Sequence, residues 1–155
     1  MIGDVRFNFR VGAFITKGNK ILMFQSAEEN AWHLVGDRVK CNENTKEALI
    51  REIEEECNEK FESDRCKLIH ISELFFDYNE INVHELNFTY HIELNEKDEL
   101  ANKQDFGSCD SEGMIYHLFD KSEVFPERIK CLPYTVYNFV MRKNFDVIEW
   151  STEKG

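Results

Sequence analysis

The sequence predicts an α/β sandwich, and three observations lead to this prediction. Residues 86–94 alternate between apolar and other side chains, which is typical of a strand with one buried face. Residues 45–57 instead repeat their apolar side chains at helical spacing. The 155 residues are enough to bury one core, so we expect a single domain over residues 1–155. Strands and helices that share one core form an α/β sandwich.

The N-terminal part is predicted to form two strands and an extended segment. Residues 7–15 and 21–24 have the apolar patterns of strands, and the turn between them has Gly18 and Asn19 at its tip. After a polar loop, residues 32–40 form a short extended or irregular segment.

The helix over 45–57 carries signals at both ends. Asn44, followed three residues later by Glu47, resembles a capping box. Asn58 tolerates the left-handed conformation in which helices end. An apolar stripe can dock this helix on a sheet, and it consists of Leu49, Ile53 and Cys57, with Ile50 beside them.

The C-terminal half adds strands, a loop and a second helix. Residues 66–76 form an extended region, and 77–80 provide a turn into the alternating strand. Residues 95–111 are polar and acidic, so we expect a loop there, followed by a strand over 114–119. Residues 133–143 are predicted to form a closing helix with Pro133 in its first turn.

Composition and charge exclude several classes of protein. The net charge of −11 disfavours binding to a nucleic-acid polymer. The chain has no apolar run of about 18 residues, and its N-terminus lacks a signal-peptide pattern, so we expect no membrane insertion and a cytoplasmic location. The five cysteines have no metal-binding spacing and an odd number, which argues against a disulfide framework or a structural zinc site.

Three carboxylates share one face of the predicted helix. At about 100° per residue, Glu52, Glu55 and Glu56 fall within an arc about 100° wide, whereas Glu54 points to the opposite side. Carboxylates this close raise one another's pKa unless a positive charge lies among them. A hard divalent cation with oxygen ligands would remove this repulsion.

The helix and the loop before it resemble the signature of the Nudix hydrolases. That signature has a Gly, five residues, a Glu, seven residues, and then Arg-Glu-aliphatic-x-Glu-Glu-x-Gly-aliphatic. The resemblance extends to Trp32–Gly36 and to His84–Leu86, which look like flanking motifs of the family, and covers the chain from about Val11 to Phe139. Six chemically specific positions of the signature are in register, namely Glu43, Arg51, Glu52, Ile53, Glu55 and Glu56.

The departures from the signature lie at positions that shape the backbone. Asp37, Asn42 and Asn58 stand where the family has Gly, Val35 where it has Pro, and Glu59 where it has an aliphatic residue. Asn and Asp are the residues after Gly that best tolerate a positive φ, so we expect the loop to keep its shape. The Arg and Glu positions are all kept, although Lys40 replaces a loop Glu that many members carry.

The resemblance implies a fold and a reaction. The fold would be a Nudix-like α/β/α sandwich with a mixed sheet and the carboxylate-bearing helix packed on it. The reaction would be metal-dependent hydrolysis of a nucleoside diphosphate linked to another group, by attack of water on phosphorus. The cofactor would be Mg²⁺ or Mn²⁺, and the partner a small nucleotide diphosphate rather than a nucleic-acid polymer. Many members of the family are homodimers, so a homodimer is also possible for this chain.

The resemblance also implies roles for individual residues. Glu52, Glu55 and Glu56 would be metal ligands, with Glu52 our first choice of general base and Glu112 the second. Arg51 would orient the site, with Glu43 as its partner or as an outer ligand. Arg38 and Lys40 precede the signature closely enough to contact phosphate, and the alternative for these two is an ordinary surface charge.

A second function class remains open from the sequence, a non-catalytic ligand-binding or regulatory domain with the same fold. Loss of a signature glutamate would have favoured it, and none is lost. For Glu112, the alternative to the role of general base is that of a solvent-facing acid beside a polar loop. The loop 95–111 is a candidate lid or specificity element, and nothing in the sequence identifies the substrate.

Overall fold

The computed structural model describes residues 4–26, 30–107 and 113–154. Its strands are β1 Val5–Lys17, β2 Lys20–Ser26, β3 Val35–Arg38, β4 Lys67–Tyr78, β5 Ile81–Glu93, β6 Phe106–Gly107, β7 Met114–Asp120 and β8 Glu149–Lys154. The helices are α1 Thr45–Cys57 and α2 Thr135–Met141, with 3₁₀ turns η1 Ser63–Arg65, η2 Glu99–Asn102 and η3 Lys121–Glu123.

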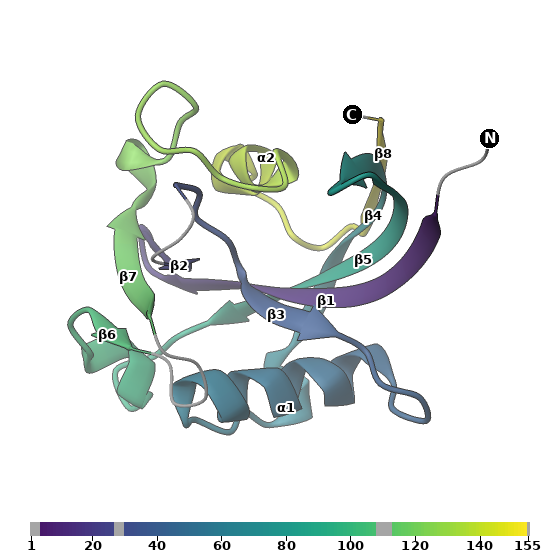
Figure 1. The fold of residues 1–155 in the computed structure, drawn as a ribbon. Helices are drawn as coiled ribbons and strands as arrows, with labels where there is room; N and C mark the ends of the chain where they lie inside the picture. Colours follow the sequence, from purple (N-terminus) through teal and green to yellow (C-terminus); the bar gives the residue numbers. More distant parts are fainter. Residues whose placement is uncertain (1–3, 27–29, 108–112, 155) are drawn as a thin grey trace.

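One mixed sheet contains all the strands, in the order β6-β7-β2-β1-β5-β4-β8, with β3 paired to β1 beside this path. β1 runs parallel to β5, and β4 runs parallel to β8, while the other pairs are antiparallel. Helix α1 covers one face of the sheet and α2 covers the other (Figure 1). This arrangement confirms the predicted α/β/α sandwich.

Helix α1 has the predicted boundaries, because local side chains fix both ends. The Asn44 side chain accepts a hydrogen bond from the Glu47 amide at 2.8 Å, and Glu47 reaches back to Asn44, which completes a capping box. Asn58 ends the helix with a left-handed φ of 57°. Backbone groups that would otherwise lack hydrogen bonds at both ends of the helix are thereby satisfied by residues adjacent in the sequence.

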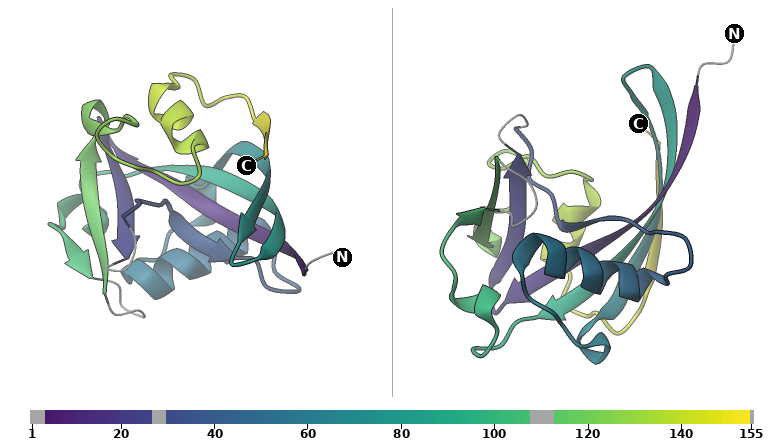
Figure 2. Two further views of the ribbon diagram at one scale, coloured as in Figure 1. Left: turned by 45° about the horizontal axis from the view of Figure 1, so that its top comes forward. Right: turned by 60° about the horizontal axis from the view of Figure 1, so that its bottom comes forward.

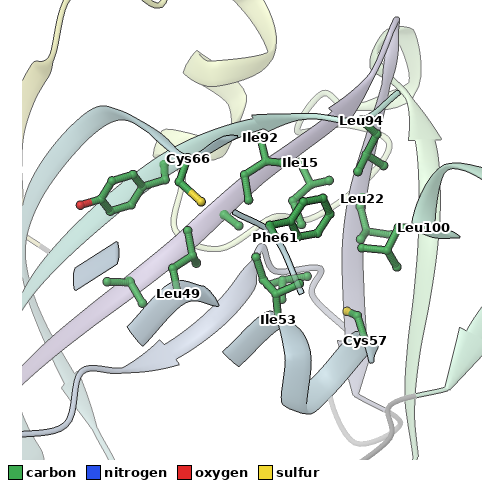
Figure 3. Close-up of a cluster of buried hydrophobic side chains, with 14 of the residues drawn as sticks. Ile15, Leu22, Leu49, Ile53, Cys57, Phe61, Cys66, Ile92, Leu94 and Leu100 are labelled. Carbon is green, nitrogen blue, oxygen red and sulfur yellow. The ribbon is translucent and has the colours of Figure 1, made fainter. Parts of the chain in front are cut away.

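The apolar stripe of α1 packs against the sheet as predicted. Leu49, Ile53 and Cys57 are fully buried and point toward side chains of β1, β2 and β5 (Figure 3). Truncating such a fully buried Leu or Ile to Ala typically costs about 2–5 kcal/mol. The stripe therefore fixes the rotation of the helix, and with it the direction of the neighbouring carboxylates.

The strands β4 and β5 form a long hairpin through the turn at Asn79 and Glu80, both of which have positive φ. Figure 2 shows that the tip of this hairpin and the N-terminal end of β1 extend beyond the rest of the molecule. The alternation over 86–94 places Tyr90 and Ile92 in the core under α1, which confirms the predicted strand.

The segment 95–111, which is predicted to be a loop, is partly regular among its described residues. It contains η2 and β6, and Leu100 in η2 is completely buried. Glu59, which follows α1, accepts hydrogen bonds from the amides of Glu99 at 3.3 Å and Leu100 at 2.8 Å. Its carboxylate therefore anchors the first part of this segment to the C-terminal end of α1.

Two C-terminal elements also differ from prediction. Helix α2 is shorter than 133–143, because Pro133 lies before it and Arg142 leaves the helical conformation. Strand β8 was not predicted, since none of its side chains is buried and its sequence has no apolar alternation. It pairs through its backbone with β4, and Ser151 there hydrogen-bonds buried His70 at 2.7 Å.

Candidate active site

The guanidinium of Arg51 is the centre of the acidic cluster on α1. It donates to Glu43 at 2.7 and 3.0 Å, to Glu52 at 2.7 Å and to Glu55 at 3.3 Å. It also donates to the backbone carbonyl of Arg38 at 3.3 Å. A planar group with five donors can join several acceptors in this way. Arg51 thus links the loop before α1 to two of the three carboxylates on the helix.

Electrostatics within this cluster differ from one carboxylate to the next. The bidentate Arg51 guanidinium lowers the pKa of Glu43 to about 2, so Glu43 is ionised at neutral pH. Burial raises the pKa of Glu52, with smaller contributions from the negative charges of Asp37 and Glu55 and an opposing one from Arg51. The Arg51 pKa is itself raised, chiefly by its hydrogen bonds to Glu43.

Glu56 lies on the inner side of the helix, one turn after Glu52. Both residues are 7% exposed, whereas Glu55 is exposed at the rim and Glu54 is also exposed. The Glu56 carboxylate accepts a hydrogen bond from the hydroxyl of Tyr116 at 3.0 Å. Nothing in the sequence singled out Tyr116, because one polar atom inside an otherwise apolar strand pattern carries no signal of its own.

The donor atoms of this cluster suit a hard divalent cation. In the part of the chain that the structure describes, no three His, Cys, Asp or Glu side chains lie close enough together to hold a metal ion. Arg51 lies between Glu52 and Glu55, and Glu56 is directed to Tyr116. Even so, one guanidinium charge is shared by Glu43, Glu52 and Glu55, so negative charge is in excess. Carboxylate oxygens in excess of positive charge fit Mg²⁺ or Mn²⁺.

The altered glycine positions before α1 differ from one another in backbone conformation. Asn42 has a φ of 68°, as expected for a residue in a glycine position. Asp37 needs no such conformation, because it lies within β3 and pairs with Val11. The Glu43 carboxylate accepts a hydrogen bond from the Lys40 amide at 2.8 Å, which closes the loop.

Gly36 is the glycine in this region that cannot be replaced. A Cβ built there would lie 2.0 Å from the carbonyl oxygen of Val11, and its φ is 149°. The backbones of β3 and β1 approach closely at this point, which sets where the loop leaves the sheet.

Of the remaining predicted site residues, Arg38 and Lys40 contribute no side chain to the hydrogen-bonded cluster around Arg51 within the described residues. The side chains of Arg38 and Lys40 are exposed, and the positive charge of Lys40 lowers the pKa of Glu43. These exposed cations lie at the end of β3 and in the loop beside the cluster. Glu112, the second choice of base, lies outside the described residues.

A small polar cavity lies under α2, on the face of the sheet opposite α1. Its volume of about 50 Å³ is large enough to hold at least one water molecule. Its polar lining comes from three strands, α2 and the segment before β3, namely Arg10, His33, Ser72, Asn87, Thr89 and Thr135. The Asn87 side-chain oxygen is buried and has no hydrogen-bond partner within the described residues. Sequence reasoning missed this lining, because the polar positions of 86–94 are also those expected to face solvent.

Among the described residues, no helix has the length and apolar character needed to cross a membrane.

Comparisons with known proteins identify the family and the fold of the chain. The NUDIX domain family matches residues 6–129 of the chain. No curated protein matches it. The fold is similar to that of a MutT protein from Bacillus halodurans, with a TM-score of 0.66, 16% identity, and coverage of 95% of this chain and 89% of that one.

Two further solved structures are similar. A MutT NUDIX hydrolase from Burkholderia pseudomallei has a TM-score of 0.66 and 17% identity, with coverage of 90% of this chain and 99% of that one. A NUDIX hydrolase from Nitrosomonas europaea has the same TM-score and identity, with coverage of 96% and 79%. At these identities the structures establish the fold, and the family match over most of the chain establishes the membership. The chain belongs to the NUDIX domain family and is a hydrolase of the Nudix type.

Proposed function

We propose that this hydrolase is a divalent-cation-dependent pyrophosphohydrolase that cleaves a nucleoside diphosphate linked to another group. The observation that carries the proposal is the sharing of the Arg51 guanidinium by Glu43, Glu52 and Glu55, one turn from buried Glu56. This helix offers oxygen donors and excess negative charge at one place. Anionic diphosphates would be repelled there without a cation, so substrate and cation binding are coupled.

The cation would be held by Glu52, Glu55 and Glu56, and it would be Mg²⁺ or Mn²⁺. Nudix hydrolases generally use divalent metals. When bound, such an ion supplies charge neutralisation at phosphoryl oxygens and increases the acidity of water. The exposed side chains of Arg38 and Lys40 bind phosphate oxygens at the rim of the same cluster.

Glu52 is the general base in this proposal. Its carboxylate accepts the proton of the attacking water, the water oxygen bonds to phosphorus, and the bridging phosphoanhydride bond breaks. Burial raises the pKa of Glu52, which makes its carboxylate a stronger base than an exposed glutamate. Arg51 orients this carboxylate through the 2.7 Å hydrogen bond, and Glu43 holds Arg51 in turn.

The test compares two glutamates two residues apart on α1. We expect Glu56→Gln to lower the rate of nucleoside monophosphate formation from a panel of nucleoside diphosphate derivatives with Mg²⁺ by at least about 100-fold, because it removes a charged oxygen ligand. Glu54→Gln is the matched control, since Glu54 is exposed and we expect it to change the rate less than about twofold. Equal effects of the two substitutions would contradict the assignment of ligands.

The alternative is a non-catalytic ligand-binding or regulatory domain. It predicts that the unsubstituted protein binds a nucleotide from the panel without hydrolysing it, with Mg²⁺ or with Mn²⁺. The retention of the Arg51 cluster favours the catalytic function, because a binding domain does not require a buried carboxylate of raised pKa beside an orienting guanidinium.

A further inference from the structure

Tyr116 places a hydroxyl against one of the proposed cation ligands from a different element. It lies in β7, is completely buried, and donates a hydrogen bond to Oε2 of Glu56 at 3.0 Å. Glu56 comes from α1 and is 7% exposed. A buried carboxylate requires hydrogen-bond donors, and a phenol in a packed strand provides one in a fixed direction.

The Tyr116 ring is in turn held by aromatic neighbours in the adjacent strands. It pairs in register with Phe24 of β2 on one side and with Phe106 of β6 on the other. Its ring stacks on Phe106 with centroids 4.9 Å apart and an interplanar angle of 7°, and lies 5.5 Å from that of Phe24. Rings packed on both sides in one sheet leave the phenol little freedom to turn.

The same edge of the sheet is attached to the end of α1. The Lys103 ammonium lies 4.8 Å from the centre of the Phe106 ring and donates to the carbonyl of Cys57 at 3.4 Å. Lys103 therefore touches both the ring that supports Tyr116 and the last turn of the helix that carries Glu56. It thereby adds a second link between this edge of the sheet and α1, besides the Tyr116–Glu56 hydrogen bond.

We propose that Tyr116 is a positioning residue for Glu56, and that the β6–β7 edge sets the affinity of the site for its divalent cation. This inference rests on the proposed function, in which Glu56 is a cation ligand. With Oε2 hydrogen-bonded to the phenol, the carboxylate is ordered before the cation binds, so less conformational entropy is lost on binding. Removing the hydroxyl leaves the charge and the ligand in place but takes away this order.

The test is Mn²⁺ binding to the full chain without substrate, measured from the electron paramagnetic resonance signal of the free ion. We expect Tyr116→Phe to raise the dissociation constant for Mn²⁺ at least about tenfold, as is typical when a partner of a metal ligand is removed. In hydrolysis assays, the Mn²⁺ concentration for half-maximal rate should rise by the same factor, while the rate at saturating Mn²⁺ changes less than threefold.

Tyr90→Phe is the matched control. Tyr90 is also buried, and its hydroxyl hydrogen-bonds the Thr45 hydroxyl at 2.6 Å at the other end of α1, away from the proposed ligands. Like Tyr116→Phe, this substitution removes a phenolic oxygen that hydrogen-bonds a residue of α1. We expect the Mn²⁺ dissociation constant to stay unchanged. An equal rise in both variants would overturn the inference, because it would reflect a loosened helix.

Phe106→Leu tests the inference without touching the hydroxyl, should Tyr116→Phe fail to fold. It removes the stacked ring, and we expect a smaller rise in the dissociation constant. An unchanged constant in both Tyr116→Phe and Phe106→Leu would overturn the positioning role alone. Absence of Mn²⁺ binding by the unsubstituted protein would overturn the proposed cation site, and the positioning role with it.

Discussion

At the scale of single residues, the acidic cluster on α1 depends on the guanidinium of Arg51, which several carboxylates share. Arg51 bonds Glu43 in a bidentate manner and still reaches Glu52 and Glu55. Because Glu43 is held by the loop amide of Lys40, it fixes Arg51 relative to the sheet. The spacing of Glu43 and Arg51 in the sequence indicated that they belong to one signature, but the hydrogen-bond pattern depends on the path of the loop.

The Glu43–Arg51 pair should make stability depend on acid pH. The pKa of Glu43 falls from 4.5 to about 2 on folding, so its stabilisation is complete above pH 4.5 and is lost as the pH falls toward 2. We expect the difference in unfolding free energy between the parent and Glu43→Gln to shrink by about 1–2 kcal/mol over this range, less than the full shift implies because solvent screens the pair. Urea denaturation at pH 5 and pH 3 measures this difference, and parallel pH profiles would contradict it.

At the scale of elements, α1 was predicted accurately and β8 was not, for physical reasons. The ends of α1 are set by Asn44, Glu47 and Asn58, which act on the adjacent backbone. Strand β8 depends on backbone pairing with β4, far away in the sequence, and has no buried side chain to mark it. Likewise, the polar segment after β5 becomes ordered through Glu59, a partner that its own composition does not reveal.

The close backbone approach of β3 and β1 at Gly36 gives a prediction at this scale. Gly36→Ala should destabilise the protein by more than about 3 kcal/mol, because the new Cβ would lie 2.0 Å from a backbone oxygen and the strands must separate. Gly18→Ala is the control: its φ is 55° and nothing lies within 4 Å, so we expect a loss of about 1 kcal/mol from backbone strain alone. Thermal unfolding of the two variants distinguishes these costs, and similar losses would contradict the close approach.

At the scale of the whole molecule, both faces of the sheet have a buried apolar cluster, and the α2 face also contains several buried polar side chains. Buried His70, Ser72, Glu85, Thr89 and Thr135 lie on or under the α2 side. The fold class could be predicted from the spacing of apolar residues, because this spacing indicates which positions face a core. The same spacing could not predict that polar side chains are buried, since their burial depends on where the C-terminal segment returns over the sheet.

Two histidines on this face, buried His70 and partly buried His91, should make the protein less stable below neutral pH. Burial lowers the pKa of His70 and of His91 from 6.5 on folding, so both bind protons more readily when unfolded. Their contribution is complete above pH 6.5 and is lost as the pH falls below it. We expect the unfolding free energy to decrease by about 1–2 kcal/mol between pH 7 and pH 5. Replacing both histidines with Gln should flatten this part of the pH profile, and an unchanged slope would exclude them as its cause.

The hydrogen bonds of Glu59 have a consequence for the order in which the chain folds. They join residues 40 and 41 positions apart, and the whole β4–β5 hairpin lies within the loop that they close. A hairpin forms from local pairs within microseconds, whereas closing an unstructured loop of this length carries an entropic cost. Prior formation of the hairpin shortens the effective loop, so we expect the C-terminal end of α1 to be fastened after β4 and β5 have paired. The capping box and Asn58 can fix both ends of α1 early, whereas the hydrogen bonds that anchor Glu59, just after the helix, form only once η2 has been synthesised.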